Sequence, residues 1–514
     1  MRMQPARTIS RRGGPDPLRA VRVACRVMML GLLCILLVGE RAYQTAYQTR
    51  SLLSNLALLP MALAGVAGLG WLRRREGSAS GKRGGRFPLA IYFALLLVVQ
   101  LIVVRSVWFY VGLDPVALTT TAQELADGMP PTYAIYYEIY PNNAALTVVY
   151  AAVLFMAGRL GLSVPYVTLI YLNAVLMNLS ALLCCLCVRR LTQSRVARGF
   201  ALGVATVWIA LSPFVMYPYS DTCALLFPVL AFYVWLRIRR PVLRRFAFTL
   251  ACFAGACVKP TVLVVWLAAA LIDGARFACL RGRRPWKRAG AAALACVLAS
   301  GCYPLIQGLC LSAITGEARS QRAVSLPHFL MMGMNGETLG GYSEEDLLYS
   351  LSFPDGAERS RAGLARAWER VRERGVGGNL DFFLAKAYKA YADGSIASNR
   401  NFPELSVPRK RDALSTLIRS IYHTRGEWNP VFNTVNQGLW LMLLLLCAAG
   451  AVRWRTAPCA VVSLTHIGLL LYQLLMECAP RYLFLFTPFF VILAAMALDE
   501  PFRLNLRLRN KAPL

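Results

Sequence analysis

Five ionisable side chains lie at the ends of long apolar runs or in a break between two of them, where an unpaired charge is costly. They are Asp114, Asp221, Lys259, Glu477 and Arg481. A carboxylate in such a place can act as a general base, and a cation there can bind an anion such as a phosphate. The sequence therefore predicts a site that combines proton transfer with anion binding, if these side chains meet.

Asp114 belongs to the segment 110–143, which follows an apolar run. Pro115 and the sequence "VALTTTAQELADG" after it predict an amphipathic helix along the membrane surface. Asp114 is the candidate catalytic residue of this segment. The alternative is that its carboxylate only caps the helix, because Asp before Pro is a common signal for a helix N-terminus.

A stretch rich in Tyr and Pro, "MPPTYAIYYEIYPNN", completes the same segment. Tyr140, Asn142 and Asn143 are candidate substrate-binding residues, because their hydroxyl and amide groups can hydrogen-bond a sugar. Two other interpretations stay open. Tyrosines are common at the headgroup level of membrane proteins, and the asparagines could cap the helix that follows.

The candidate residues for binding a phosphate are Lys259 in "CVKPT" and Arg481 in "APRYLF". Lys259 could instead extend from a broken helix to the lipid headgroups. Arg481 could instead anchor the last apolar run or pair with Glu477 one turn earlier. Asp221 in "YSDT" is a further substrate-binding candidate, and its alternative role is to cap the run that follows.

The composition indicates a membrane protein. The chain of 514 residues is 57% hydrophobic and 16% charged, whereas soluble domains carry about 25% charged residues. A helix that crosses the roughly 30 Å hydrocarbon core needs about 20 apolar residues. Candidate runs lie at 21–39, 52–72, 88–109, 144–160, 165–188, 199–217, 223–236, 246–258, 261–277, 289–313, 433–452, 457–475 and 480–498. We therefore expect an all-α polytopic fold with 12 or 13 transmembrane helices.

The formal net charge of +30 could suggest a nucleic-acid partner, but the basic residues cluster in short loops between the apolar runs. Cytoplasmic loops of membrane proteins are rich in Lys and Arg, so no nucleic-acid partner is expected. The clusters lie at 73–86, 188–199, 237–245, 281–288 and 453–455. If these loops are cytoplasmic, the five ionisable residues named first all lie on the extracytoplasmic side.

The number of membrane crossings made by the runs 144–160 and 165–188 stays open. These two runs separate an outer loop from the basic loop 188–199, and an odd number of crossings is required there. Either one of the two runs is re-entrant, or the loop 188–199 does not follow the charge rule.

The predicted spans divide the chain into three regions. Residues 1–313 are an N-terminal transmembrane module, residues 314–430 an extracytoplasmic region with surface helices, and residues 431–514 the C-terminal transmembrane helices. His328 lies on an apolar piece of the middle region, and it is either a substrate-binding or a structural histidine. The region 314–430 has no Cys, and the 15 Cys of the chain lie in or beside apolar segments, so neither a disulfide framework nor a zinc site is expected.

The plan resembles the membrane glycosyltransferases of the C superfamily, and especially bacterial relatives of the protein O-mannosyltransferases and of family 39. The resemblance rests on "LDP" after an early apolar run, "YPNN" before the next run and "APRYLF" ahead of the last. It covers the overall plan and roughly residues 88–300. Many members carry a second acidic residue in this first outer loop, often beside the first. This chain has Pro115 there, so a divalent metal stays an open question.

The resemblance implies transfer of a sugar, with inversion, from a polyprenyl-phosphate donor to a hydroxyl of a glycan, glycolipid or protein acceptor. The reaction would take place on the outer face of the cell membrane. Asp114 matches the position of the family base. The phosphate of the donor would then lie near Lys259 and Arg481.

Two other classes of function remain. A transporter or flippase of a lipid-linked sugar could use the same basic and aromatic groups, although transporters usually bind near the midplane between repeated halves. A non-catalytic membrane scaffold is the third possibility. The absence of a Walker loop and of an HExxH motif argues against an ATP-driven pump and a metalloprotease.

Overall fold

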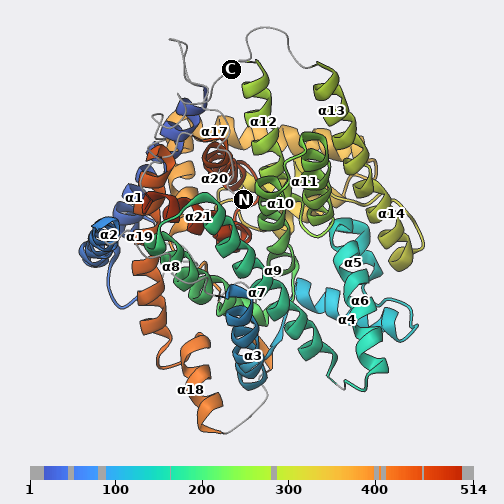
Figure 1. The fold of residues 1–514 in the computed structure, drawn as a ribbon. Coiled ribbons are helices and arrows are strands. Elements are labelled where there is room, and N and C mark those ends of the chain that lie inside the picture. Colours follow the sequence, from blue (N-terminus) through green and yellow to red (C-terminus); the bar gives the residue numbers. More distant parts are fainter. Residues whose placement is uncertain are drawn as a thin grey trace.

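The computed structural model describes residues 17–43, 51–78, 88–162, 164–278, 286–398, 404–406, 412–453 and 456–499. Most of these residues are helical, as Figure 1 shows. The α-helices are α1 (Pro17–Ala42), α2 (Asn55–Ser78), α3 (Leu89–Val107), α4 (Asp114–Ala126), α5 (Ala134–Ile139), α6 (Ala144–Arg159), α7 (Pro165–Leu191), α8 (Arg195–Val204), α9 (Ser220–Cys223), α10 (Leu226–Arg237), α11 (Pro241–Ala256), α12 (Leu263–Ala278), α13 (Trp286–Ser300), α14 (Cys302–Thr315), α15 (Leu326–Gly333), α16 (Glu344–Leu351), α17 (Gly356–Tyr391), α18 (Ala413–Tyr422), α19 (Asn429–Arg453), α20 (Ala457–Leu475) and α21 (Thr487–Ala497).

Short pieces of other regular structure connect the helices. Strand β1 (Tyr110–Val111) pairs antiparallel with strand β2 (Glu404–Ser406), which holds the start of the segment 110–143 against the long middle region. A π-helical segment, η2 (Ala205–Ala210), continues α8. The 3-10 segments are η1 (Pro141–Asn143), η3 (Pro213–Met216), η4 (Pro260–Val262) and η5 (Pro480–Phe486).

The predicted all-α polytopic fold is confirmed. By length and apolar composition, 12 helical segments of the described residues can cross a membrane. They correspond to the predicted runs with one exception, the run 246–258. This run lies in α11, which has 16 residues and a length of about 24 Å, a little short for a span by itself.

Contacts between helix ends define two faces of the bundle. At one face Glu76, near the end of α2, accepts hydrogen bonds from Ser194 and from the backbone of Arg195. At the other face Tyr166, near the start of α7, packs against Trp108 and Tyr110, which follow α3. We call the second the site face, because Asp114 follows there, and the first the basic face. The helix α7 therefore runs from the site face to the basic face.

The helix α6 does not cross between these faces. Its start is joined to α4 through Tyr137, whose hydroxyl lies 2.8 Å from Thr147 Oγ1 and 3.4 Å from the carbonyl oxygen of Ala117. Its end, at Gly158 and Arg159, lines a common cleft with Pro165 at the start of α7. Both ends of α6 therefore lie on the site face. We infer from these contacts that the run 144–160 is the one that does not cross, and that the run 165–188 is not re-entrant.

The helix α11 provides the crossing that this count requires. Near its start Arg245 forms an ion pair of 3.1 Å with Asp273 near the end of α12, and Lys259 after its end pairs with Asp221 on the site face. The chain thus passes from the basic face to the site face through a short helix. If α11 is counted as a crossing helix and α6 is not, each connection between the described helices lies on one of the two faces and none has to pass through the membrane.

The sequence between α14 and α19 forms helices on the site face. The first part of α17 is one of the predicted surface helices, and it begins where the Asp355 side chain accepts from the backbone N–H groups of Ala357 and Glu358. Gly375, at φ 61°, interrupts α17 with a backbone conformation that suits Gly. The second part of α17 packs against α1 and α20 and so reaches the membrane-spanning helices.

Cysteine labelling tests the position of α6. In detergent-free vesicles of one orientation, Leu162→Cys and Glu317→Cys are expected to react with a membrane-impermeant maleimide from the same side. Arg239→Cys, in the exposed turn between α10 and α11, is expected to react from the opposite side. Labelling of Leu162→Cys together with Arg239→Cys would contradict the assignment of α6. The unmodified protein supplies the background, because its described cysteines are mostly buried.

Candidate functional site

Three of the predicted residues form one buried ionic cluster. Asp221 pairs through Oδ1 with the ammonium of Lys259, and its Oδ2 lies 3.4 Å from Nε of Arg481. Asp221 is 2% exposed and Lys259 8%. Lys259 also lies over the ring of Tyr482, with 4.4 Å from Nζ to the ring centroid. Buried charges need such partners, and one carboxylate opposite two cations gives these three side chains a net positive charge.

All three side chains of the cluster come from breaks in the helical bundle. The breaks contain η3, η4 and η5, and each of these segments begins with a proline, which cannot continue an α-helix ladder. The irregular backbone before Asp221 is held by Asn173 of α7. Its amide donates to carbonyl oxygens of η3 and of Tyr217 at 3.0–3.2 Å. Non-helical backbone at this depth is stable where it is enclosed by protein in this way.

Asp114 lies next to the ionic cluster and is joined to it by Tyr219. The hydroxyl of Tyr219 donates to Oδ2 of Asp114 at 2.8 Å. The guanidinium carbon of Arg481 lies 5.8 Å from the centre of the Tyr219 ring. Tyr219 is two residues before Asp221 in the chain, so one short segment contacts both the candidate base and the candidate phosphate-binding residues.

The capping alternative for Asp114 is not what the structure shows. The N-cap of α4 is Leu113, without a side-chain cap, and Asp114 is the first helical residue. Leu113 has φ 63°, a left-handed conformation that is costly for a leucine. This strained turn directs the carboxylate of Asp114 toward Tyr219 instead of toward the N–H groups of its own helix.

A second layer of polar groups supports Tyr219. Tyr136 of α5 hydrogen-bonds Tyr219, and the Asn143 amide donates to the Tyr136 hydroxyl at 2.6 Å. Burial, and then the nearby Tyr219 and Asp114, raise the pKa of Tyr136, so this phenol stays protonated. Asn143, Tyr136, Tyr219 and Asp114 thus form a continuous hydrogen-bonded chain that ends on the carboxylate.

The remaining residues of the Tyr-rich stretch have different positions. Tyr140 packs on Tyr136 with 5.4 Å between ring centroids. Its pKa is raised by burial and by the proximity of Tyr342, Asp114 and Glu477, so Tyr140 lies within the site. Asn142 is partly exposed and donates to Asn143 at 3.2 Å. Neither the Asn142 nor the Asn143 side chain caps α6, so the capping alternative for the asparagines is wrong.

His328 is not part of this arrangement. It is 1% exposed in α15, and its Nδ1 lies 2.7 Å from the hydroxyl of Ser350. Burial lowers its pKa to about 4, so the ring is neutral at neutral pH, and the charged groups that affect it are Asp346 and Arg359. These contacts lie within the packing of α15, α16 and α17, which makes His328 a structural residue there.

Two buried lysines of α17 were not singled out by sequence. Nζ of Lys386 donates three hydrogen bonds of 2.6–2.8 Å to carbonyl oxygens at the ends of α15 and α20. Lys389 does the same to the turn at residues 338–339. Burial lowers the pKa of Lys386 to about 8. Lys386 therefore fixes the backbone just before Glu477, and Lys389 fixes the backbone a few residues before Tyr342.

A metal ion has no evident ligand set in this site. Among the described residues, no group of three or more His, Cys, Asp or Glu side chains is arranged to hold one. Asp114 has Leu113 and Pro115 as neighbours instead of a second acid.

Comparison with known proteins identifies a family for this chain. A family model described as a conserved hypothetical integral membrane protein matches residues 82–502, which include every residue of the site. No curated protein matches the chain. The family description states membrane integration and no reaction, so the function is argued from the geometry of the site.

Proposed function

The chain belongs to this family of conserved hypothetical integral membrane proteins, and we propose that it is a lipid-phosphate-dependent glycosyltransferase of the C type. In this proposal it transfers a sugar from a polyprenyl-phosphate donor to an acceptor hydroxyl at the site face. The observation that carries the proposal is the link from Asp114 through Tyr219 to the cluster of Asp221, Lys259 and Arg481. A candidate base and a net positive cluster therefore lie side by side.

Asp114 is the general base of the proposed reaction. Oδ2 of Asp114 is occupied by the Tyr219 hydroxyl, which leaves Oδ1 for the acceptor hydroxyl. As the acceptor oxygen bonds to the anomeric carbon, its proton passes to Oδ1. The bond between this carbon and the phosphate oxygen breaks, and its electron pair stays on the phosphate. Attack from the side opposite the leaving group inverts the anomeric centre.

The ionic cluster stabilises the leaving phosphate in this proposal. Lys259 and Arg481 share Asp221, and the donor phosphate would be a further anion against the same two cations. Arg481 is the better placed of the two, because its side chain is 16% exposed whereas that of Lys259 is 10% exposed. Oriented cations and hydrogen-bond donors that meet developing negative charge typically supply the largest share of catalysis.

The surroundings of the site suit a lipid-linked donor. The cluster lies where several membrane helices are broken, next to Tyr140 and Tyr482. Tyrosines of this kind lie at the headgroup level, which is where the phosphate of a polyprenyl donor is found. With the basic loops in the cytoplasm, the site face is extracytoplasmic, and the acceptor is a glycan, glycolipid or protein outside the cell membrane.

A reconstituted assay distinguishes this enzyme from a flippase. Proteoliposomes that contain the protein receive undecaprenyl-phosphate hexoses labelled in the sugar, together with delipidated envelope material as acceptor. For the enzyme we expect labelled acceptor and an equal amount of released undecaprenyl phosphate. Movement of the labelled donor across the bilayer without release of undecaprenyl phosphate would contradict the proposal and favour a flippase. Protein-free liposomes are the control.

A further inference from the structure

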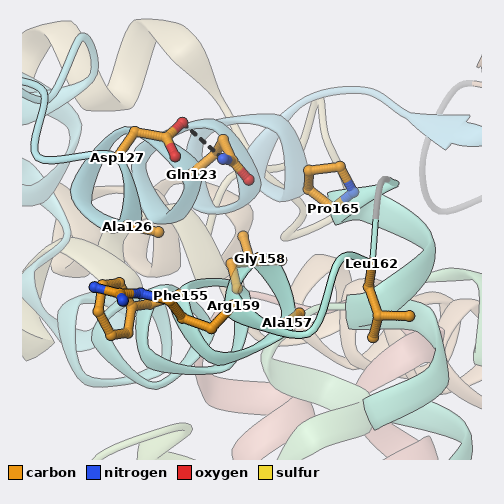
Figure 2. Close-up of a pocket in the computed structure, with 10 residues that line it drawn as sticks. Gln123, Ala126, Asp127, Phe155, Ala157, Gly158, Arg159, Leu162 and Pro165 are labelled. Carbon is orange, nitrogen blue, oxygen red and sulfur yellow. Dashed lines mark hydrogen bonds between the residues drawn. The ribbon is translucent and has the colours of Figure 1, made fainter.

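A second site lies apart from the ionic cluster, in the cleft between α4 and α6. The cleft has a volume of about 240 Å³ and is shown in Figure 2. Asp127, directly after α4, and Arg159, the last residue of α6, lie at one end of it, and Leu162 and Pro165 at the other. Asp127 is 13 residues from Asp114 along the chain, which is about 20 Å along a helix. The cleft is therefore too distant to hold the reacting groups of the first site.

The polar groups of the cleft are of opposite charge and are not paired with each other. No ion pair joins Asp127 and Arg159 in the part of the chain that the structure describes. The guanidinium carbon of Arg159 lies 5.1 Å from the centre of the Phe155 ring, which holds the side chain beside the opening. Gln123 donates to Oδ2 of Asp127 at 2.7 Å, and its own Oε1 is buried with no hydrogen-bond partner among the described residues. The cleft thus offers one cation, one anion and one free acceptor.

The position of the cleft is that of the lipid headgroups. Pro165 lines the cleft, and the next residue, Tyr166, packs with Trp108 and Tyr110 in the kind of aromatic cluster that marks the membrane interface. The end of α6 and the turn after it expose Met156, Leu160 and Leu162, at 57%, 78% and 53%. Since α6 does not cross the membrane, these apolar side chains form a surface on which acyl chains can lie beside the cleft.

We infer that this cleft binds the headgroup of a zwitterionic phospholipid with hydrogen-bond donors, phosphatidylethanolamine. The phosphate pairs with Arg159, and the ammonium donates to Asp127 and to the free Oε1 of Gln123. A net charge of zero in the cleft matches the net charge of this headgroup. The same positions discriminate against phosphatidylcholine, because its quaternary ammonium has no N–H group to satisfy the buried acceptor.

The expected selectivity can be measured directly. Native mass spectrometry of the full-length protein in detergent, titrated with each lipid, gives apparent dissociation constants. We expect phosphatidylethanolamine to bind about tenfold more tightly than phosphatidylcholine, as follows from charge-assisted hydrogen bonds that only the first can make. Equal binding of the two lipids, or tighter binding of phosphatidylglycerol than of phosphatidylethanolamine, would overturn the inference.

Three variants test the named contacts. Asp127→Asn is expected to remove the preference for phosphatidylethanolamine over phosphatidylcholine, and Arg159→Gln to weaken the binding of both lipids. Gly158→Leu fills the cleft without a change of charge, because a side chain at Gly158 would meet open space. It is expected to abolish selective binding. If selectivity survives either Asp127→Asn or Gly158→Leu in folded protein, the cleft is not the site.

Matched controls separate the cleft from general effects on the protein. Glu369→Gln removes an exposed acid of α17, and Gly203→Leu adds a side chain at an exposed glycine of α8 with open space around it. Both are expected to keep the lipid preference of the unmodified protein. Loss of selectivity in either control would contradict a local site in the cleft. The assay needs no acceptor or sugar donor, so its outcome does not depend on the proposed transferase activity.

Discussion

Replacing Asp114 with Asn is expected to lower the rate of sugar transfer by about 10²- to 10⁴-fold, the usual contribution of a general base. Asn retains the size of the side chain and an oxygen that can accept from Tyr219, so the helix start and the hydrogen-bonded chain are preserved. It cannot take the proton of the acceptor hydroxyl. The measurement is the initial rate of release of undecaprenyl phosphate by equal amounts of folded protein.

Two comparisons make the Asp114 result specific. Glu138→Gln changes an acid of the same outer segment that pairs with the exposed Arg322 at 3.3 Å, and it is expected to keep the full rate. Tyr219→Phe removes the hydrogen bond that orients Asp114 and is expected to cause a smaller loss than Asp114→Asn. An Asp114→Asn protein that transfers sugar at the normal rate would remove Asp114 as the base.

Replacing Asp221 with Asn is expected to destabilise the protein by about 3 kcal/mol, because it removes the buried carboxylate that pairs with Lys259 and lies 3.4 Å from Arg481. In the double variant Asp221→Asn/Lys259→Met one of these two cations is also removed. We expect the double variant to be more stable than the sum of the single changes predicts, by at least about 1 kcal/mol. Reversible unfolding in mixed micelles gives the free energies of unfolding.

Asp273 supplies the matched control for this experiment. It also faces two cations, Arg245 at 3.1 Å and Arg276 at 3.9 Å, but its side chain is 19% exposed whereas that of Asp221 is 3% exposed. Asp273→Asn is expected to cost less than about 1 kcal/mol, since ion pairs open to solvent contribute little. Equal destabilisation by Asp221→Asn and Asp273→Asn would show that burial of the ionic cluster has no special role.

The side-chain contacts of the site were only partly predictable. Asp114, Asp221, Lys259 and Arg481 attracted attention because a charge at the end of an apolar run is rare, and the structure brings all four together. Tyr219 gave no such signal, because tyrosine is common at membrane interfaces. Its role depends on the strained turn and the broken helices that direct it between Asp114 and Arg481.

For His328, Lys386 and Lys389 the sequence did not predict the position that the structure shows. His328 stood out by its rarity but is buried with Ser350, away from the site. The sequence did not indicate that Lys386 and Lys389 are buried, because they lie in the charged middle region and helical spacing does not distinguish a solvated lysine from a buried one. Their structural role follows only from the tertiary structure, in which both ammonium groups donate to backbone carbonyl oxygens at the ends of other helices or in a turn.

The amino-acid sequence by itself determined that this is an all-α polytopic membrane protein, and it gathered the key ionisable groups at one face. It could do so because the length of an apolar run and the charge of a loop are local properties set by the bilayer. Only the tertiary structure decided that α6 stays on the site face while α11, which has the same 16 residues in length, crosses. An apolar helix can be covered by lipid or by a neighbouring helix such as α4, and composition is the same in both cases.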